Sequence, residues 1–237
     1  MTTLNDSLYE VVARHDGSPN PFSRLQGICH ACIEVLDVTG AGVMLMAERM
    51  HQGTAYATDE TIRGLEDLQN AAAEGPCLDA YNLGRPVLEP DLAGPGVRTW
   101  PVLGTSAVRH GMRAAFGFPL LLDDTSVGAL DLYRDQPGPL DEGQVRDARL
   151  LAAMAAREVL AMQAQAPEGS LPAELAGLSG DRATLEQATG MSAAQQGTTV
   201  IDAARRLRDH ARQHDRSVAS IAQDIVDRKL RLDGPGR

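Results

Sequence analysis

Arginines gather in one short segment near the end of the chain, at a spacing that suits contact with phosphate groups. Residues 205–216 hold five arginines and two aspartates. Successive residues of a helix are turned by roughly 100°, so Arg205, Arg208 and Arg212 fall within an arc of about 60°, and Arg216 extends this row. Guanidinium groups bind phosphate oxygens through paired hydrogen bonds. The spacing predicts a phosphate-binding row; the alternative is a solvated helix face with internal ion pairs.

Aromatic residues restrict the kind of nucleic-acid site that this segment could form. The chain has only eight of them, and none follows Tyr133. Folds that stack bases on aromatic rings are therefore excluded for the C-terminal part, where arginine and histidine remain for stacking. His210 and His214 share a helix face, but no third metal ligand lies at a suitable offset. We expect them to be ordinary, partly buried histidines.

Three cysteines are the other residues that could carry chemistry. Cys29 and Cys32 form a Cys-x-x-Cys pair, which occurs in redox and zinc sites. Both fall on the apolar side of a helical pattern, where free cysteine acts as a small apolar residue, and we expect them to be buried. Cys77 follows Gly75-Pro76 and is expected to be partly exposed. One candidate function is therefore that of a thiol redox sensor, or of a reductase of the methionine-sulfoxide type, that uses Cys77 with Cys29 or Cys32.

Sequence motifs of common enzymes are not found. The chain has no nucleophile elbow, phosphate-binding loop, dinucleotide fingerprint or metalloprotease helix. We therefore predict that the protein is not an enzyme, and we assign no catalytic residue, no metal ligand and no cofactor.

Charge is distributed unevenly along the 237 residues, whose net charge is −10. Residues 1–170 hold 12 basic and 23 acidic residues, a net charge of −11, whereas residues 171–237 hold ten basic and nine acidic ones, a net charge of +1. This asymmetry predicts two parts with different roles. No apolar run is long enough to span a membrane, no signal peptide is recognisable and the cysteines are too few for a disulfide framework. These features predict a cytoplasmic protein without membrane contact.

Hydrophobic periodicity predicts mixed structure in the first part. The pattern indicates two strands joined by a turn at residues 123–126, which favours an α+β fold with an antiparallel sheet. The expected helices are 21–36, 61–72 and a long one at 141–162, and the expected strands are 43–47, 114–122 and 127–133.

The second part is expected to be an all-α three-helix bundle. Pro167, Gly169 and Pro172 mark residues 163–175 as a linker. Three helices with narrow, alanine-rich apolar stripes follow, at 181–196, 198–214 and 217–232, with caps at Thr198-Thr199 and Ser217. The apolar stripe of the second helix is formed by Val200, Ala204, Leu207 and Ala211.

This second part resembles an ANTAR domain, the RNA-binding module of bacterial transcription antitermination regulators. The resemblance implies a three-helix bundle that binds RNA with paired small hairpins, usually as a dimer, and prevents a terminator from forming. It places Gln187 and Thr189 near the arginine row; many members carry lysine where this chain has Thr189. The matching residues are Leu185 to Met191, Gly197, Ala203-Ala204, Leu207-Arg208, Ala211, Asp215-Arg216, Val218, Ile221-Ala222 and Ile225-Val226.

The first part resembles a GAF sensor domain. That resemblance implies a six-stranded antiparallel sheet flanked by helices, but no ligand, because the cyclic-nucleotide signature of some GAF domains is not evident. The matching residues are Glu74 to Cys77 with Ala80, Asp91-Leu92, Trp100-Pro101, Pro119-Leu120 and Gly128-Ala129-Leu130.

Together these features predict a regulator of three segments: a GAF-like sensor at 1–162, the linker at 163–175 and an ANTAR bundle at 176–237. The sensor would respond to an unknown small-molecule or protein signal, and the bundle would bind tandem hairpins in nascent RNA. The helix at 141–162 would couple them, packed against its copy in a homodimer. An interaction protein with a degenerate ANTAR half is a further alternative.

Overall fold

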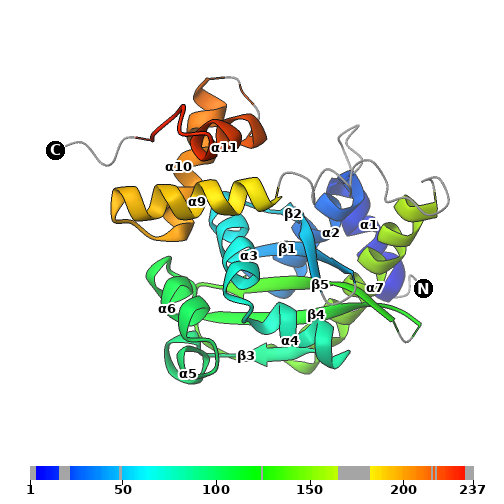
Figure 1. Ribbon diagram of the computed structural model, residues 1–237. Coiled ribbons are helices and arrows are strands. Elements are labelled where there is room, and N and C mark those ends of the chain that lie inside the picture. The colour runs from blue at the N-terminus through cyan, green and yellow to red at the C-terminus, as the bar shows by residue number, and fades with distance from the viewer. Residues whose placement is uncertain are drawn as a thin grey trace. The chain divides into compact units, whose positions relative to one another are not determined.

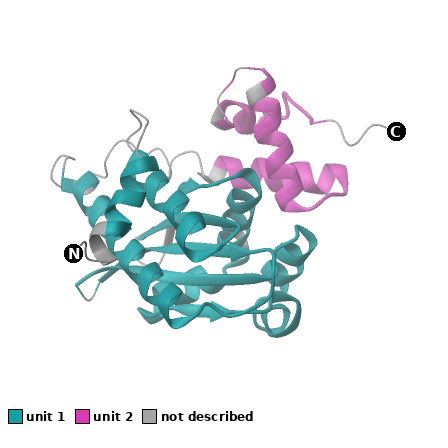
Figure 2. Cartoon of the chain, turned by 180° about the vertical axis from the view of Figure 1, so that it is seen from behind, with its two compact units in different colours: residues 1–175 teal, residues 176–237 magenta. Residues whose placement is uncertain are grey.

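The chain forms two compact units, residues 1–175 and 176–237 (Figure 2). The computed structural model describes residues 4–15, 22–47, 50–123, 125–164, 182–214, 216 and 218–232. The linker predicted at 163–175 lies outside these residues from position 165 onward. No helix among the described residues is long and apolar enough to cross a membrane.

The first unit is built on an antiparallel sheet with the strand order β2-β1-β5-β4-β3, so β5 lies at its centre. The described residues form five strands where six were expected. Between β3 and β4 the chain instead forms three short helical segments, η1, α5 and α6. The strands are β1 (Gly40–Ala47), β2 (Met50–Ala57), β3 (Val87–Glu89), β4 (Ala114–Leu122) and β5 (Thr125–Arg134), and the helical segments are η1 (Leu92–Gly96), α5 (Val97–Thr99) and α6 (Pro101–Arg109).

Helices cover both faces of the sheet (Figure 1). The helices α2 and α7 pack on one face, with α1 against α2, and α3 and α4 pack on the other. Hydrophobic periodicity located α2, α3, α7, β1, β4 and β5, but not α1, α4, β2 or β3. The helices are α1 (Leu4–His15), α2 (Ser23–Leu36), α3 (Glu60–Ala72), α4 (Pro76–Leu83) and α7 (Glu142–Ala164).

Local side-chain caps explain where two of these helices begin. Asp59 precedes α3, and its carboxylate accepts hydrogen bonds from the amides of Thr61 and Ile62. Asp141 precedes α7 and forms a reciprocal pair with Gln144: each side chain accepts a hydrogen bond from the other residue's amide, at 2.8 and 3.0 Å. Both arrangements satisfy amides that lack partners at a helix start.

The second unit is a three-helix bundle of α9 (Arg182–Gln196), α10 (Val200–Gln213) and α11 (Val218–Val226). The third helix ends six residues before the predicted position 232. Arg228 has a left-handed φ of 60°, and the Lys229 amide bonds to the Asp224 carbonyl, so the chain turns back there. The turn carries Leu232 onto the bundle core, which is formed by Ala188, Leu207, Ala211, Ile221, Ala222, Ile225 and Leu232.

The cap predicted at Thr198-Thr199 is present and is formed by Thr199. Its Oγ1 accepts a hydrogen bond from the Asp202 amide at 3.0 Å and donates one to Asp202 Oδ2 at 2.6 Å. We expect Thr199→Ala to destabilise α10 by about 1 kcal/mol, because two groups at the helix start lose their partner. Amide hydrogen exchange within α10 of the full chain measures this loss. Thr198→Ala is the control, and equal protection in the two variants would contradict the assignment.

Candidate RNA interface and a buried polar cluster

Two arginines of the predicted row are exposed and held by carboxylates. The Arg205 side chain is 47% exposed, and its Nη2 lies 2.6 Å from Asp202 Oδ1. The Arg216 side chain is 41% exposed, and its Nη2 lies 2.6 Å from Asp224 Oδ2 and 2.6 Å from Ser220 Oγ. Each guanidinium is thereby oriented, while the fork retains further N–H donors. The side chain of Arg212 lies outside the described part of the structure.

Arg208 differs from the rest of the row because it is only 6% exposed. Ile201 is seven residues earlier, on the same side of α10, and is also buried. The apolar stripe predicted from the sequence runs through Val200, Ala204, Leu207 and Ala211 and does not include this side of the helix. The buried arc of α10 is therefore wider than predicted, and Arg208 lies inside it.

The two residues predicted on the first helix of the bundle lie on different sides of it. Gln187 is exposed on α9, whereas the next two residues, Ala188 and Thr189, are buried. Thr189 is 4% exposed. The structure therefore presents Arg205, Arg216 and Gln187 at the surface, and it places Arg208 and Thr189 within the protein.

His210 and His214 form a stacked pair, with ring centroids 4.0 Å apart. His214 Nδ1 lies 2.8 Å from the His210 carbonyl oxygen. Partial burial lowers the pKa of His210, and the charges of His214 and Arg216 lower it further. An uncharged imidazole face of this kind can stack on a planar group.

The three cysteines are all buried. This confirms the expectation for Cys29 and Cys32, but the expectation that Cys77 is partly exposed is wrong. Gly75-Pro76 resembles a loop in the sequence, yet Pro76 is the first residue of α4 and carries Cys77 inward. Burial, followed by the charges of Asp131 and Glu66, raises the pKa of the Cys77 thiol well above its usual range. Such a thiol lacks the exposure and the thiolate character of a redox nucleophile.

Cys77 belongs to a cluster of three buried ionisable residues that come from different elements. Glu66 lies on α3, Cys77 on α4 and Asp131 on β5, and one oxygen of each carboxylate and the Cys77 Sγ all lie within 4.8 Å of one another. Burial raises the pKa of Asp131 to about 6. Burial, followed by the charge of Asp131, raises the pKa of Glu66 well above its usual range. This cluster was not predicted from the sequence.

Two glycines of the sheet make room for the cluster. Asp131 on the central strand is paired with Gly42 on β1 and with Gly117 on β4. A Cβ on Gly42 would lie 2.9 Å from Glu66 Oε1, and a Cβ on Gly117 would lie 2.3 Å from the Pro76 carbonyl oxygen. A side chain at position 117 would collide with the backbone at the start of α4, and one at position 42 would displace the Glu66 carboxylate, so the two glycines let Cys77 and Glu66 reach Asp131.

Side chains around the cluster connect its elements. Gln69 on α3 is buried; its Oε1 accepts a hydrogen bond from the Cys77 amide at 3.1 Å, and its Nε2 donates one to the Tyr133 hydroxyl at 2.8 Å. One amide group therefore links α3 to the start of α4 and to β5.

Residues that carry the GAF resemblance fix the other side of α4. Glu74 Oε1 accepts a hydrogen bond from the Leu103 amide at 2.7 Å, in the first turn of α6. The Trp100 indole N–H donates to Asp79 Oδ2 at 3.0 Å. These contacts attach α4 and the residues just before it to the helical segments between β3 and β4.

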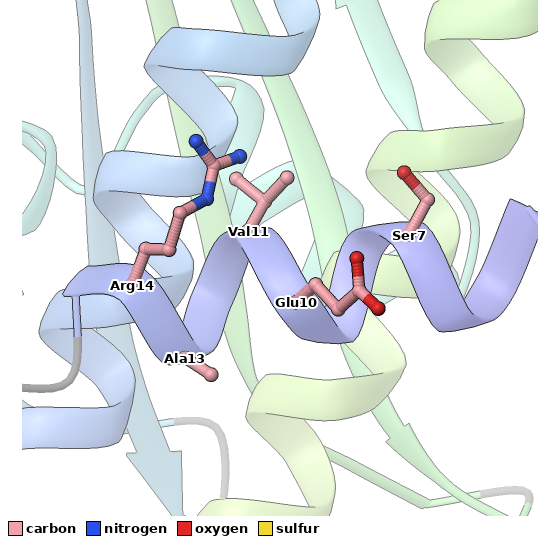
Figure 3. A pocket seen from close by; sticks show the side chains of 5 residues that line it. All are labelled: Ser7, Glu10, Val11, Ala13 and Arg14. Atoms are coloured by element: carbon pink, nitrogen blue, oxygen red, sulfur yellow. The ribbon is translucent and has the colours of Figure 1, made fainter.

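A surface depression of about 500 Å³ lies on α1 (Figure 3). It is lined by Ser7, Glu10, Val11, Ala13 and Arg14, all from that helix. Its arginine already binds Glu34, with Nη2 2.9 Å from Oε1. The depression presents a surface ion pair and no converging set of polar groups from other elements.

Comparisons with known proteins agree with this architecture. The GAF domain of a phosphoenolpyruvate-protein phosphotransferase from Coxiella burnetii superposes with a TM-score of 0.51 at 15% identity, covering 69% of this chain and 98% of that one. The GAF domain of the Acinetobacter phosphoenolpyruvate-protein phosphotransferase superposes with a TM-score of 0.50 at 13% identity, covering 69% and 96%. At these identities the likeness shows the fold alone. No match is found among curated proteins.

Family models identify both units. The GAF domain matches residues 23–158, and the ANTAR domain matches residues 175–226. These matches cover the unit that holds the sheet and the three-helix unit in turn. The chain therefore belongs to the GAF domain family and is a regulator in which that sensor domain is followed by an RNA-binding ANTAR domain.

Proposed function

We propose that the protein is a transcription antitermination regulator, in which the GAF unit controls the binding of the ANTAR unit to paired hairpins in nascent RNA. The observation that supports this function best is the pair of exposed, oriented guanidiniums at Arg205 and Arg216. The proteins of this type act by holding RNA in a form that prevents a terminator hairpin. Catalysis by the chain itself forms no part of the proposal.

The arginines would contact phosphates without a large ordering cost. Asp202 and Asp224 already hold the two guanidiniums in place, so fewer rotamers are lost when RNA binds. The same carboxylates reduce the net positive charge, so the contact would depend on local hydrogen bonds more than on long-range attraction. Arg212 and Gln187 would extend the contact, and the stacked faces of His210 and His214 would receive a loop base.

Arg208 and Thr189 would act in a different way. Because both are buried, we propose that they shape the bundle and do not contact RNA directly. The usual lysine at the position of Thr189 would then be replaced by a residue that packs inside, and RNA contact would depend more on the arginines of α10.

Two hairpins in one RNA suit two copies of the chain. On α7, the side that packs against its own unit is formed by the buried residues Ala148, Leu151, Ala155 and Val159. Leu160 on the same helix is 49% exposed. We propose that α7 pairs with its copy through the exposed side, as an α-helical dimer that presents one ANTAR unit to each hairpin.

Removal of the exposed arginine pair should weaken RNA binding. We expect the double variant Arg205→Ala/Arg216→Ala to lose affinity for a labelled two-hairpin RNA and to lower the log–log salt slope by about 1.4–1.8, the range for two phosphate contacts on single-stranded and duplex nucleic acid. Fluorescence anisotropy of the full-length protein over a salt series measures both quantities.

The control for that experiment removes equal charge elsewhere. Arg85 and Arg98 are exposed in the GAF unit and lie outside α7, and Arg85→Ala/Arg98→Ala should leave affinity and slope unchanged. A loop-scrambled RNA should bind the wild-type protein more weakly than the two-hairpin RNA. Equal losses in the two double variants would contradict a specific contact, and no loss in either would make the row a solvated helix face. Sedimentation of the complex should give two chains for each RNA.

Arg208 should behave as an interior residue. We expect Arg208→Ala to destabilise α10 by about 1–3 kcal/mol, because a buried group loses its interactions, and to leave the salt slope for RNA unchanged in the folded protein. Amide exchange in α10 and anisotropy at a temperature where the variant is folded measure the two effects. A lower salt slope without loss of amide protection would show that Arg208 contacts phosphate.

Antitermination itself is tested by transcription in vitro. A template with two hairpins before a terminator should give more readthrough when the wild-type protein is added, and less with the Arg205→Ala/Arg216→Ala variant. If the protein binds the RNA but readthrough does not change, the binding has another role.

A further inference from the structure

We propose that Glu66, Cys77 and Asp131 form a binding site for one divalent transition-metal ion inside the GAF unit. The donor atoms, one oxygen of each carboxylate and the Cys77 Sγ, lie within 4.8 Å of one another and converge from α3, α4 and β5. A small movement of these side chains brings all three to one ion. The site concerns the sensor unit alone and stands whether or not the second unit binds RNA.

The carboxylates of the cluster lack the partners that buried charges need. All four carboxylate oxygens of Glu66 and Asp131 are buried, and none has a hydrogen-bond partner of normal length and angle among the described residues. Contacts of Asp131 with Glu66, Cys77 and Gln69 offset only part of the effect of burial on its pKa. Ionised groups in a protein interior are normally paired, hydrogen-bonded or bound to a metal. A bound cation would provide the missing interaction for both residues at once.

The donor set indicates the class of ion. Thiolate sulfur is a poor ligand for Mg²⁺ and Ca²⁺, whereas Zn²⁺ and similar ions bind cysteine sulfur together with aspartate or glutamate oxygen. Two carboxylates and one thiolate carry −3, so a divalent ion leaves −1 at the site. As the metal binds, the thiol proton of Cys77 and the proton that Glu66 holds in the metal-free protein both pass to solvent, and no electron is transferred.

The surroundings are suited to holding such ligands in place. Gln69 fixes the backbone of Cys77 through its Oε1 and reaches Tyr133 through its Nε2, as a second layer of contacts around the donors. Gly42 and Gly117 keep the space beside Asp131 open for α3 and α4. Three protein donors leave one position of a tetrahedral ion for water or a small ligand, which is the arrangement that a sensor would use.

Metal binding by the full-length protein tests the site. The protein is treated with a chelator, freed of it, incubated with Zn²⁺ and dialysed. We then expect one Zn²⁺ per chain by elemental analysis. Co²⁺ should give a thiolate-to-metal charge-transfer band. Cys77→Ala should abolish that band and weaken Zn²⁺ binding by more than the 10–100-fold typical of lost outer-shell contacts, because a direct ligand is removed.

Two further variants keep the result interpretable. Cys32→Ala removes an equally buried thiol outside the cluster and should retain the band and the affinity. Asp131→Asn should lose the metal but remain folded, since it removes a buried charge that the metal-free protein must otherwise accommodate; circular dichroism checks folding. Absence of stoichiometric binding by the wild-type protein would overturn the proposal. Binding that persists in both Cys77→Ala and Asp131→Asn would also overturn it and would assign the ion to surface histidines.

Discussion

The close approach of two helices to the middle of the sheet is the constraint on which the first unit depends. Asp131 lies on the central strand with glycine on each side, Gly42 and Gly117, and no side chain at those positions keeps α3 and α4 away. An acid in such a place would normally be excluded from a core. Its presence beside Glu66 and Cys77 indicates that this face of the sheet is built to accommodate polar groups.

The second unit, in contrast, depends on a compact apolar interior of small residues. Ala188, Ala211 and Ala222 pack with Leu207 and the isoleucines of α11, so the helices can lie close together. The narrow bundle leaves long side chains at its edges, and Arg205 and Arg216 are there with a carboxylate each. Arg208 shows the limit of this rule, because a single turn of the helix separates an exposed arginine from a buried one.

The sequence predicted the elements with strong periodicity and missed those without it. The hairpin of β4 and β5, the long helix α7 and the three helices of the bundle have regular apolar spacing, whereas α4, which begins at Pro76, does not and was not predicted. The row of arginines followed from helical geometry, but an arc drawn from four apolar residues omitted Ile201 and misplaced Arg208. The cluster could not be predicted from spacing, because its three residues are far apart in the chain; the one signal was Asp131, a charge within an apolar strand.

The cluster is also connected to the helix that leads toward the second unit in the sequence. Three residues after Asp131 on β5, the Arg134 guanidinium donates from Nη2 to the Leu36 carbonyl at 3.0 Å and from Nε to the Asp37 carbonyl at 2.8 Å. Gln144 at the start of α7 donates to the same Leu36 carbonyl at 2.9 Å. A change in the position of β5 would therefore act on the end of α2 and the start of α7 together. Because α7 precedes the ANTAR unit in the sequence, an event at the buried acids could reach this helix through the backbone of β5 and then through the hydrogen bonds of Arg134 and Gln144 to the Leu36 carbonyl.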